Sequence, residues 1–314
     1  MAVHHNTRHE WVALPRSVQN TVEAHRASTV ITAQTQPGGF TSGVAAVLEF
    51  DDGSKAFVKA VRSDDHMADE YRQEAIVAPQ LPTSLRAPRL QLSFEHVGWV
   101  VLMFDAVSGR LPTSPWRDSE LTKAVSAISS LADVLTPSPV RSVPTMEELM
   151  AGEFSTFRQL MRDGRSGPIN VASLDLAVRS LLPVLASLES DWATLNAGET
   201  LTHFDLRSDN LILDVDDAVW IVDWSSPCLA APWVDIVTFL PTVGRRPEEI
   251  ESLFLTTSPG RHAPSDAVNA LLAALTGMWF ERSGHPAPAH VPHLRDHQRK
   301  CGRAAFAWLA LRCG

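Results

Sequence analysis

The sequence lacks the features that mark membrane-spanning and secreted proteins. No apolar run reaches the ~18 residues that a membrane-spanning helix needs. The opening residues, MAVHHNTRHEW, have neither the cationic start nor the apolar stretch of a secretion signal. The three cysteines, Cys228, Cys301 and Cys313, form neither an even disulfide set nor a CxxC metal pair, so reduced thiols are expected. These absences predict a cytoplasmic protein with no membrane partner.

Positive charge is also scarce. The chain has 27 Lys and Arg against 36 Asp and Glu, a formal net charge of −9. A nucleic-acid-binding protein must offset many phosphates with Lys and Arg, so no nucleic-acid partner is expected. The negative excess suits a cationic small-molecule substrate or serves solubility alone. With 314 residues, 45% of them hydrophobic, and no internal repeat, the chain can form a globular protein of two lobes.

The first hundred residues predict a small sheet with accompanying helices. The strand-like stretches GVAAVLEF and KAFVKAV flank DDGS, which supplies the turn of a hairpin. A helix is expected near Ser17–Ser28, and another in DDHMADEYRQEAIVAPQL, which Pro79 and Pro82 bring to an end. Residues Trp99–Phe104 predict a buried strand that runs into a glycine-containing connector.

From about Arg110 onward the patterns are mainly helical. The exception is NLILDVDDAVWIVDW, two short apolar runs around Asp216 and Asp217 that predict a hairpin. We therefore divide the chain into a β-rich part, residues 1–106, and a mainly helical part, residues 107–314. The expected helices are Leu121–Leu135, Met146–Asp163, Ser173–Leu195, Asp266–Ser283 and His297–Arg312.

The stretch LTHFDLRSDN, residues 201–210, concentrates charged groups just before this hairpin. It carries His203, Asp205 and Asn210, and Asp223 follows at the far end of the hairpin. This set suits phosphoryl transfer, in which one carboxylate receives a hydroxyl proton while an amide and a second carboxylate hold magnesium. An isolated Asp or Asn more commonly serves a turn or a helix cap. The four residues in this order favour the catalytic interpretation.

Two features of the N-terminal half also suit a phosphate-binding site. PGGFTSG, residues 37–43, is a glycine-rich turn whose backbone N–H groups can face phosphates, although such clusters also make plain hairpin loops. Lys59, in the strand AFVKAV, shares its face with Phe57 and Val61. It could bind phosphate, or it could be one of the lysines that commonly lie on the edge strand of a sheet. The turn residues expected to contact the nucleotide are Gly38, Gly39, Ser42 and Gly43.

HFDLRSDN followed by VDW resembles the aminoglycoside phosphotransferase family, relatives of the eukaryotic protein kinases, with the pattern HxDxxxxN and then a hydrophobic pair and Asp-Trp. The resemblance runs from about Gly38 to the final helix and is strongest to some actinobacterial members. It implies an α+β, bilobal protein-kinase-like fold with a β-rich N-lobe and a mainly helical C-lobe. Two positions depart from the pattern, since Phe204 replaces a common glycine and Ser225 a frequent acidic residue.

The resemblance also implies roles at the catalytic loop and the metal site. Asp205 would accept or orient the proton of the substrate hydroxyl, and Arg207 would lie near the transferring phosphate. Asn210 and Asp223 would bind Mg²⁺. His203 is expected to be structural, and Asp235 to cap a helix or to join a buried ion pair.

The resemblance assigns a nucleotide site to the N-terminal half. Lys59 would contact the α- and β-phosphates and pair with Glu74 on the following helix, for which Glu70 is the alternative. The stretch LMFDAV would present backbone groups to a purine, with Met103 at the rear of the pocket. Phe57 is bulkier than the residue that kinases often have two positions before this lysine. The sequence therefore leaves open whether ATP or GTP is the phosphate donor. The expected contacts in this stretch are Met103, Phe104, Asp105 and Val107.

These features predict an enzyme that moves the γ-phosphate of ATP or GTP to a hydroxyl group of a small molecule. An antibiotic or another natural product, inactivated by the transfer, is the first hypothesis for the acceptor. The alternative is a metabolite kinase acting on a choline-, sugar- or amino-alcohol-like substrate, for which Glu147, Glu148 and Glu153 would supply negative charge or would only form a solvated helix face. A nucleotide-binding pseudokinase is the third hypothesis, and it is disfavoured because no catalytic residue is missing.

Overall fold

The computed structural model describes residues 8–36, 43–288 and 291–314. By their contacts the residues form two compact units: 1–112 with 209–226, and 113–208 with 227–314. The segment 209–226, which the sequence-based division assigned to the second part of the chain, groups with the first unit.

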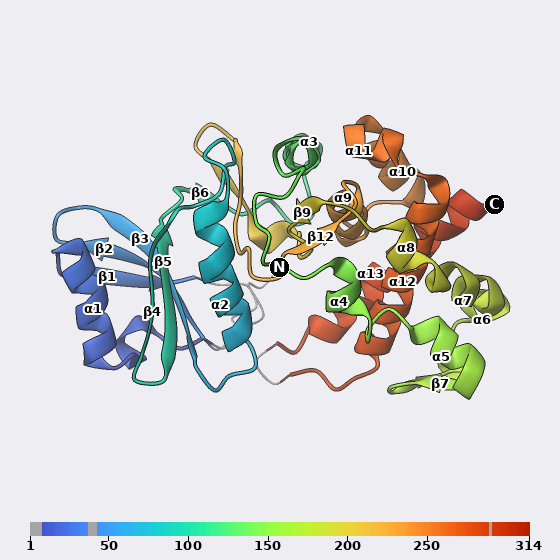
Figure 1. Cartoon of the computed structure of the whole chain (residues 1–314), viewed down its shortest axis with the longest axis horizontal. Helices are drawn as coiled ribbons and strands as arrows, with labels where there is room; N and C mark the ends of the chain where they lie inside the picture. The colour runs from blue at the N-terminus through green and yellow to red at the C-terminus, as the bar shows by residue number, and fades with distance from the viewer. Residues whose placement is uncertain (1–7, 37–42, 289–290) are drawn as a thin grey trace. The chain divides into compact units, whose positions relative to one another are not determined.

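The first unit is built on a five-stranded antiparallel sheet with the strand order β1-β2-β3-β5-β4 (Figure 1). The predicted hairpin is confirmed, because β2 and β3 pair directly and Gly53 in their turn has a φ of 79°. The strands are β1 (Val30–Thr35), β2 (Val44–Phe50), β3 (Lys55–Arg62), β4 (Leu90–His96) and β5 (Trp99–Asp105).

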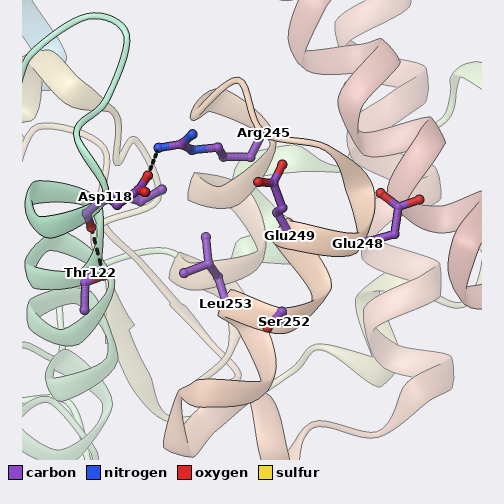
Figure 2. A pocket seen from close by; sticks show the side chains of 8 residues that line it. Asp118, Thr122, Arg245, Glu248, Glu249, Ser252 and Leu253 are labelled. Carbon is purple, nitrogen blue, oxygen red and sulfur yellow. Dashed lines mark hydrogen bonds and ion pairs between the residues drawn. The ribbon is translucent and has the colours of Figure 1, made fainter.

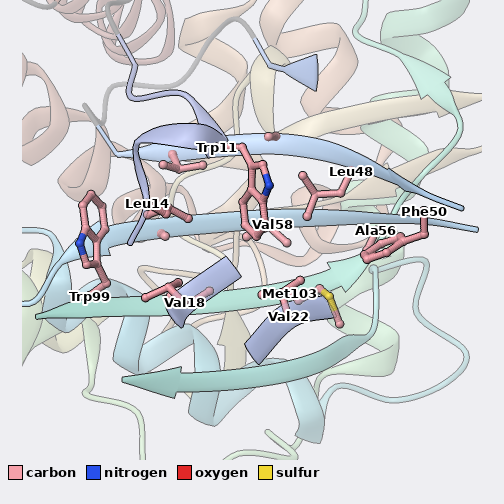
Figure 3. Close-up of a cluster of buried hydrophobic side chains, with 14 residues drawn as sticks. Trp11, Leu14, Val18, Val22, Leu48, Phe50, Ala56, Val58, Trp99 and Met103 are labelled. Atoms are coloured by element: carbon pink, nitrogen blue, oxygen red, sulfur yellow. The ribbon is translucent and has the colours of Figure 1, made fainter. Parts of the chain in front are cut away.

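Each face of this sheet buries a separate apolar cluster, because successive side chains of a strand point to opposite faces. One face packs against the helix α1 (Arg16–Arg26) and the short 3-10 helix η1 (Trp11–Ala13). In Figure 3 the side chains of these helices lie over strand residues of this face, among them Leu48, Val58 and Met103.

The opposite face of the sheet carries Val61, Leu102 and Phe104. These residues pack with Tyr71 of α2 (Ala68–Val77) and with Ala78, where the 3-10 helix η2 (Ala78–Gln80) begins. Asp69 and Glu70 lie in the first turn of α2, where negative charge favours the helix dipole. Lys59 lies on this second face, over the rings of Tyr71 and Phe104.

The second predicted hairpin is also confirmed. Strands β10 (Leu211–Asp214) and β11 (Val219–Ile221) pair antiparallel, and β6 (Gly109–Arg110) extends them to a small three-stranded sheet. The Asp214 carboxylate accepts hydrogen bonds from the backbone N–H groups of Asp216 and Ala218, which closes the turn.

The second unit is mainly helical, as the sequence predicts, and its central element is α12 (Ser265–Ser283). Apolar residues lie all around this helix, which suits an element buried on most sides. It lies beside α13 and also contacts α5, α7, α8 and α9 (Figure 1). The other elements are α3 (Asp118–Val134), α4 (Met146–Met150), α5 (Thr156–Asp163), β7 (Arg165–Ser166), β8 (Ile169–Asn170), η3 (Val171–Ser173), α6 (Leu176–Ser180), α7 (Leu182–Ser190), α8 (Trp192–Leu195), β9 (Thr200–Thr202), β12 (Cys228–Ala230), α9 (Val234–Phe239), η5 (Leu240–Thr242), α10 (Pro247–Thr256), α11 (Ser258–His262) and α13 (Leu294–Cys313), and η4 (Ser208–Asn210) straddles the boundary between the units.

Two of the predicted helices are interrupted in the structure. Met146–Asp163 forms α4 and α5, and Ser173–Leu195 contains α6, α7 and α8. A tertiary contact accounts for the start of α5, because the buried Glu189 carboxylate accepts hydrogen bonds from the N–H groups of Phe157 and Arg158. It thereby satisfies donors that have no partner within the first turn of a helix. Across the residues described, no helix combines the length and apolarity needed to cross a membrane.

Candidate active site

Lys59 lies buried between two carboxylates of the first unit. Its side chain is 8% exposed, and its Nζ forms an ion pair with Glu74 and lies 2.6 Å from Asp223 Oδ1. Strand β3, which carries Lys59, is flanked by β2 and β5, so the alternative of an edge-strand charge is wrong. The partner that α2 supplies in this ion pair is Glu74, the predicted residue.

The charges of this cluster depend on one another. Burial by itself would lower the pKa of Lys59, but the carboxylates of Asp223 and Glu74 outweigh it and hold that pKa above its usual value. Burial raises the pKa of Glu74 to about 7, against the opposing attraction of Lys59. Lys59 therefore keeps its positive charge in a site from which water is largely excluded. Such a group is suited to binding phosphate oxygens.

Asn210 and Asp223 lie at the open end of the hairpin of β10 and β11. The Val222 N–H donates to the Asn210 carbonyl oxygen at 3.0 Å, one position beyond the last strand pair, Leu211 with Ile221. The Asn210 residue is buried, whereas the Asp223 side chain is 37% exposed. Asp223 adopts a φ of 67°, in the left-handed region.

The donor atoms at this end of the hairpin fit magnesium. A carboxylate and an amide oxygen are ligands that Mg²⁺ accepts, and it commonly takes one or two protein ligands together with nucleotide phosphates and water. Among the residues that the structure describes, no three His, Cys, Asp or Glu side chains are grouped so as to hold a metal. A magnesium ion bound by Asn210 and Asp223 would therefore depend on the nucleotide for further ligands.

Asp205 and Arg207 lie in the second unit, on the loop after β9. An Arg207 Nη1 donates to Asp205 Oδ1 at 3.0 Å, so the structure joins the two predicted catalytic residues in an ion pair. The Asp205 side chain is 39% exposed and that of Arg207 16%. The carboxylate is therefore accessible to a substrate and is oriented by a more buried cation.

The buried Asp235 of α9 holds the start of this loop. Its Oδ2 accepts a hydrogen bond from the His203 N–H and its Oδ1 one from the Phe204 N–H, both at 2.9 Å. Burial raises the pKa of Asp235, while His203 and these two N–H groups act in the opposite direction. The Asp205 N–H lies 3.4 Å from His203 Nδ1, so the imidazole contacts the loop backbone. Asp235 thus positions the backbone immediately before Asp205.

Of the glycine-rich turn, only Gly43 can be placed, because Gly38, Gly39 and Ser42 lie outside the described residues. Gly43 precedes β2 and is buried. A Cβ atom at Gly43 would lie 2.4 Å from the backbone oxygen of Ala60, the residue after Lys59. The close approach of the two strands here therefore requires glycine.

The predicted purine-contacting residues lie at the end of β5 and just beyond it. Phe104 shares the face of the sheet with Lys59, whereas the Met103 side chain is buried in the core of the opposite face. The Asp105 N–H donates to the Arg89 carbonyl at 2.9 Å, and the half-buried Val107 follows in the connector to β6.

The first unit also contains Arg8, which was not among the predicted site residues. Burial lowers the pKa of its guanidinium, while Tyr71, Asp223 and Asp209 act in the opposite direction. Arg8 is thus a further cation in the electrostatic environment of Asp223. No motif marks it, since only the folded chain brings residue 8 within the influence of residues 209 and 223.

A separate cavity of about 330 Å³ lies within the second unit (Figure 2). It is lined by α3 and α10 and by Arg245, which forms an ion pair with Asp118 and donates to the Trp116 carbonyl at 3.0 Å. The side chains labelled in Figure 2 are mostly charged or polar, and no predicted site residue is among those that line the cavity. The cavity is therefore no part of the candidate active site.

Comparison with known proteins shows the family of this chain. The model of the phosphotransferase enzyme family (APH) matches residues 38–265, more than half of the chain, and the chain belongs to this family. It is a phosphotransferase enzyme, as the sequence predicts. No curated protein matches the sequence.

Solved structures match most of the chain at low sequence identity. The choline kinase LicA from Streptococcus pneumoniae is 14% identical with a TM-score of 0.63, covering 94% of this chain and 98% of its own. An ethanolamine kinase from Plasmodium vivax is 12% identical with a TM-score of 0.56, covering 92% and 84%. An aminoglycoside phosphotransferase from Streptomyces rimosus, solved with ADP and streptomycin, is 18% identical with a TM-score of 0.52, covering 85% and 100%. The predicted protein-kinase-like fold class is confirmed.

Proposed function

We propose that this phosphotransferase moves the γ-phosphate of ATP or GTP to a hydroxyl group of a small molecule, and that the acceptor is an antibiotic or another natural product, which the transfer inactivates. The observation that carries the proposal is the buried, charged Lys59 held by Glu74 and Asp223. The structure of the Streptomyces rimosus relative with ADP and streptomycin supports a nucleotide donor and an antibiotic acceptor.

The first unit supplies the groups that would bind the nucleotide. Lys59 would contact phosphate oxygens, and backbone N–H groups of the glycine-rich turn that ends at Gly43 would face the phosphates. Asn210 and Asp223 would hold Mg²⁺, whose chemistry here is to offset the charge of the phosphate oxygens. The backbone groups of Phe104, Asp105 and Val107 would meet the purine.

Asp205 would orient the acceptor hydroxyl and receive its proton. The exposure of its carboxylate allows contact with an acceptor, and the ion pair with Arg207 orients the carboxylate. The hydrogen bonds that Asp235 accepts from the N–H groups of His203 and Phe204 hold the loop backbone before Asp205 in place. The Asp205 carboxylate would therefore be positioned before the acceptor binds. Asp205 and Asn210 lie on one short loop of the sequence, HFDLRSDN.

The alternative, a kinase for choline-like or amino-alcohol acceptors, needs negative charge for a cationic substrate. Two of the three acidic candidates already have partners. Glu148 caps α4 by accepting from the Thr145 N–H at 2.8 Å, and Glu153 pairs with Arg282 at 3.0 Å. This observation favours a natural product over a small cation. The presence of Lys59, Asp205, Asn210 and Asp223 disfavours a pseudokinase.

The proposal is tested by transfer of label from γ-labelled ATP, and separately GTP, into aminoglycosides, aromatic and nucleoside antibiotics, and choline. Asp205→Asn removes the proposed base, and Asp133→Asn, an exposed position on α3, is the matched control. Transfer that Asp133→Asn retains and Asp205→Asn loses would support the proposal. Transfer to choline alone would support the metabolite kinase, and Mg²⁺-dependent nucleotide binding without transfer to any acceptor would support the pseudokinase.

A further inference from the structure

Phe204, directly before the proposed base Asp205, has an unusual backbone conformation. Its φ is 65°, in the left-handed region that glycine adopts readily and that is unfavourable for a residue with a Cβ atom. Strained positions of this kind are found disproportionately at functional sites. An aromatic residue here is therefore a feature that local backbone preference does not explain.

The phenylalanine side chain does not create this conformation. The backbone is held by the Asp235 carboxylate, which accepts hydrogen bonds from the N–H groups of His203 and Phe204. These N–H groups would be available whatever side chain stood at position 204, other than proline. The reason for an aromatic side chain must therefore lie in what its ring contacts.

The core of the second unit does not account for the ring either. Phe204 is only half-buried, and its ring centroid lies 6.5 Å from that of Phe154, near the outer limit for an aromatic pair. Phe154 is itself fully buried and already packs edge-on against Trp192 at 4.9 Å. Phe204 thus keeps part of its surface exposed, and the accessible Asp205 carboxylate follows it directly in the chain.

We propose that Phe204 determines acceptor specificity, because its exposed ring face contacts an apolar or aromatic ring of the acceptor beside the hydroxyl that is phosphorylated. The inference rests on the proposed function and narrows its acceptor class. An apolar ring gains from covering the exposed face of Phe204, because both surfaces leave water. The ring face also attracts cations, but the primary ammonium groups of a polycationic sugar are strongly hydrated, so such an acceptor gains less from Phe204 than an apolar ring does. The acceptor is thus a hydroxyl compound with an apolar or aromatic ring rather than a polycationic sugar.

The test compares wild type with Phe204→Gly, which removes the ring while suiting the left-handed backbone. Dissociation constants are measured by titration calorimetry in the presence of Mg²⁺ and a non-hydrolysable ATP analogue. The probes are chloramphenicol and puromycin as aromatic hydroxyl compounds, kanamycin and streptomycin as polycations, and choline. Val97→Gly is the matched control, since Val97 also has a left-handed φ of 49° and is 56% exposed in the hairpin of β4 and β5.

We expect at least one aromatic compound to bind wild type and Val97→Gly equally and Phe204→Gly at least 10-fold more weakly, while the affinity for the ATP analogue is unchanged. The urea midpoint of Phe204→Gly should equal or exceed that of wild type. The inference is overturned if no aromatic compound binds, or if Phe204→Gly leaves the dissociation constants of the aromatic compounds unchanged. It is also overturned if the substitution weakens the binding of choline or of the polycations instead. A large fall in the urea midpoint with unchanged binding would show a packing role and would also overturn it.

These outcomes separate the inference from the proposed function. If the aromatic compounds bind through Phe204 but wild type transfers no phosphate, the proposed function fails, and only the binding of aromatic ligands by Phe204 is supported. If Asp205→Asn loses phosphate transfer but Phe204→Gly binds the preferred acceptor as tightly as wild type does, the proposed function stands and the specificity role fails.

Discussion

Lys59 Nζ and Asp223 Oδ1 lie 2.6 Å apart although 164 positions separate the two residues in the chain. This contact joins the central part of the sheet to the end of the hairpin of β10 and β11, in agreement with the grouping of residues 209–226 with the first unit. Both residues are proposed to meet the nucleotide and its metal, so binding of the nucleotide must exchange this contact for others.

Lys59→Met should destabilise the protein by about 3 kcal/mol at pH 8, because the buried Glu74 then has no cation beside it and must either carry an uncompensated charge or take up a proton. Adding Glu74→Gln removes that uncompensated charge and should restore part of the loss. Urea unfolding of the two single variants and the double variant measures the coupling. A double variant no more stable than Lys59→Met would contradict this account of the cluster.

Glu74 should make stability depend on pH. Its pKa is raised by burial from 4.5 to about 7, so folding favours the protonated form and the contribution of Glu74 to stability is lost as pH rises through this window. The free energy of unfolding of wild type minus that of Glu74→Gln should therefore fall between pH 5 and pH 8. Urea titrations at several pH values measure this difference. A difference that is constant or rises with pH would disagree with the raised pKa.

Asp235→Asn should weaken the loop before Asp205. An amide offers one acceptor oxygen, so one of the N–H groups of His203 and Phe204 loses its partner, at a cost of about 2 kcal/mol. The maximal rate of phosphate transfer should fall, because Asp205 is less well positioned, while nucleotide affinity is retained. Asp133→Asn should change neither the unfolding free energy nor the rate. Unaltered stability in Asp235→Asn would show that the two hydrogen bonds contribute little.

Gly43→Ala should destabilise the protein by about 2 kcal/mol, because the added Cβ atom would meet the backbone oxygen of Ala60 at 2.4 Å. Nucleotide affinity should fall as well, since Lys59 precedes Ala60 on the strand. Gly152→Ala is the matched control, because nothing lies within 4 Å of its Cβ position. Thermal unfolding and titration with ATP measure the two effects, and equal behaviour of both alanine variants would rule out the steric argument.

The thiols should differ in reactivity. Cys313 is exposed, whereas Cys228 and Cys301 are buried and burial raises the pKa of both thiols to about 12. Iodoacetamide at pH 8 should modify Cys313 in the native protein and all three residues in urea. Mass spectrometry of peptides identifies the modified positions. Modification of Cys228 at the rate of Cys313 without denaturant would contradict its burial in the pair of β9 and β12.

Part of the fold could be predicted because it is local. The alternation in KAFVKAV placed Lys59 on one face with Phe57 and Val61, and the turn residues DDGS closed a real hairpin. The single helix expected over Met146–Asp163 was wrong, because the start of α5 depends on Glu189, which no local pattern reveals. Strand alternation predicts that the side chains of Met103 and Phe104 point to opposite faces of the sheet. Which of the two faces packs against α2 depends on the tertiary structure.

The sequence by itself determined the order of chemistry-bearing groups, HxDxxxxN and then Asp-Trp, and the hairpin whose register brings Asn210 beside Val222, because both depend on spacing along one short segment. Only the tertiary structure decided which carboxylates surround Lys59 and that Asp223 acts electrostatically on Arg8. It also decided that Asp235 accepts a hydrogen bond from Phe204, whose backbone is in the left-handed region. Those relationships depend on burial and on distances between residues far apart in the chain, and neither quantity exists until the chain has folded.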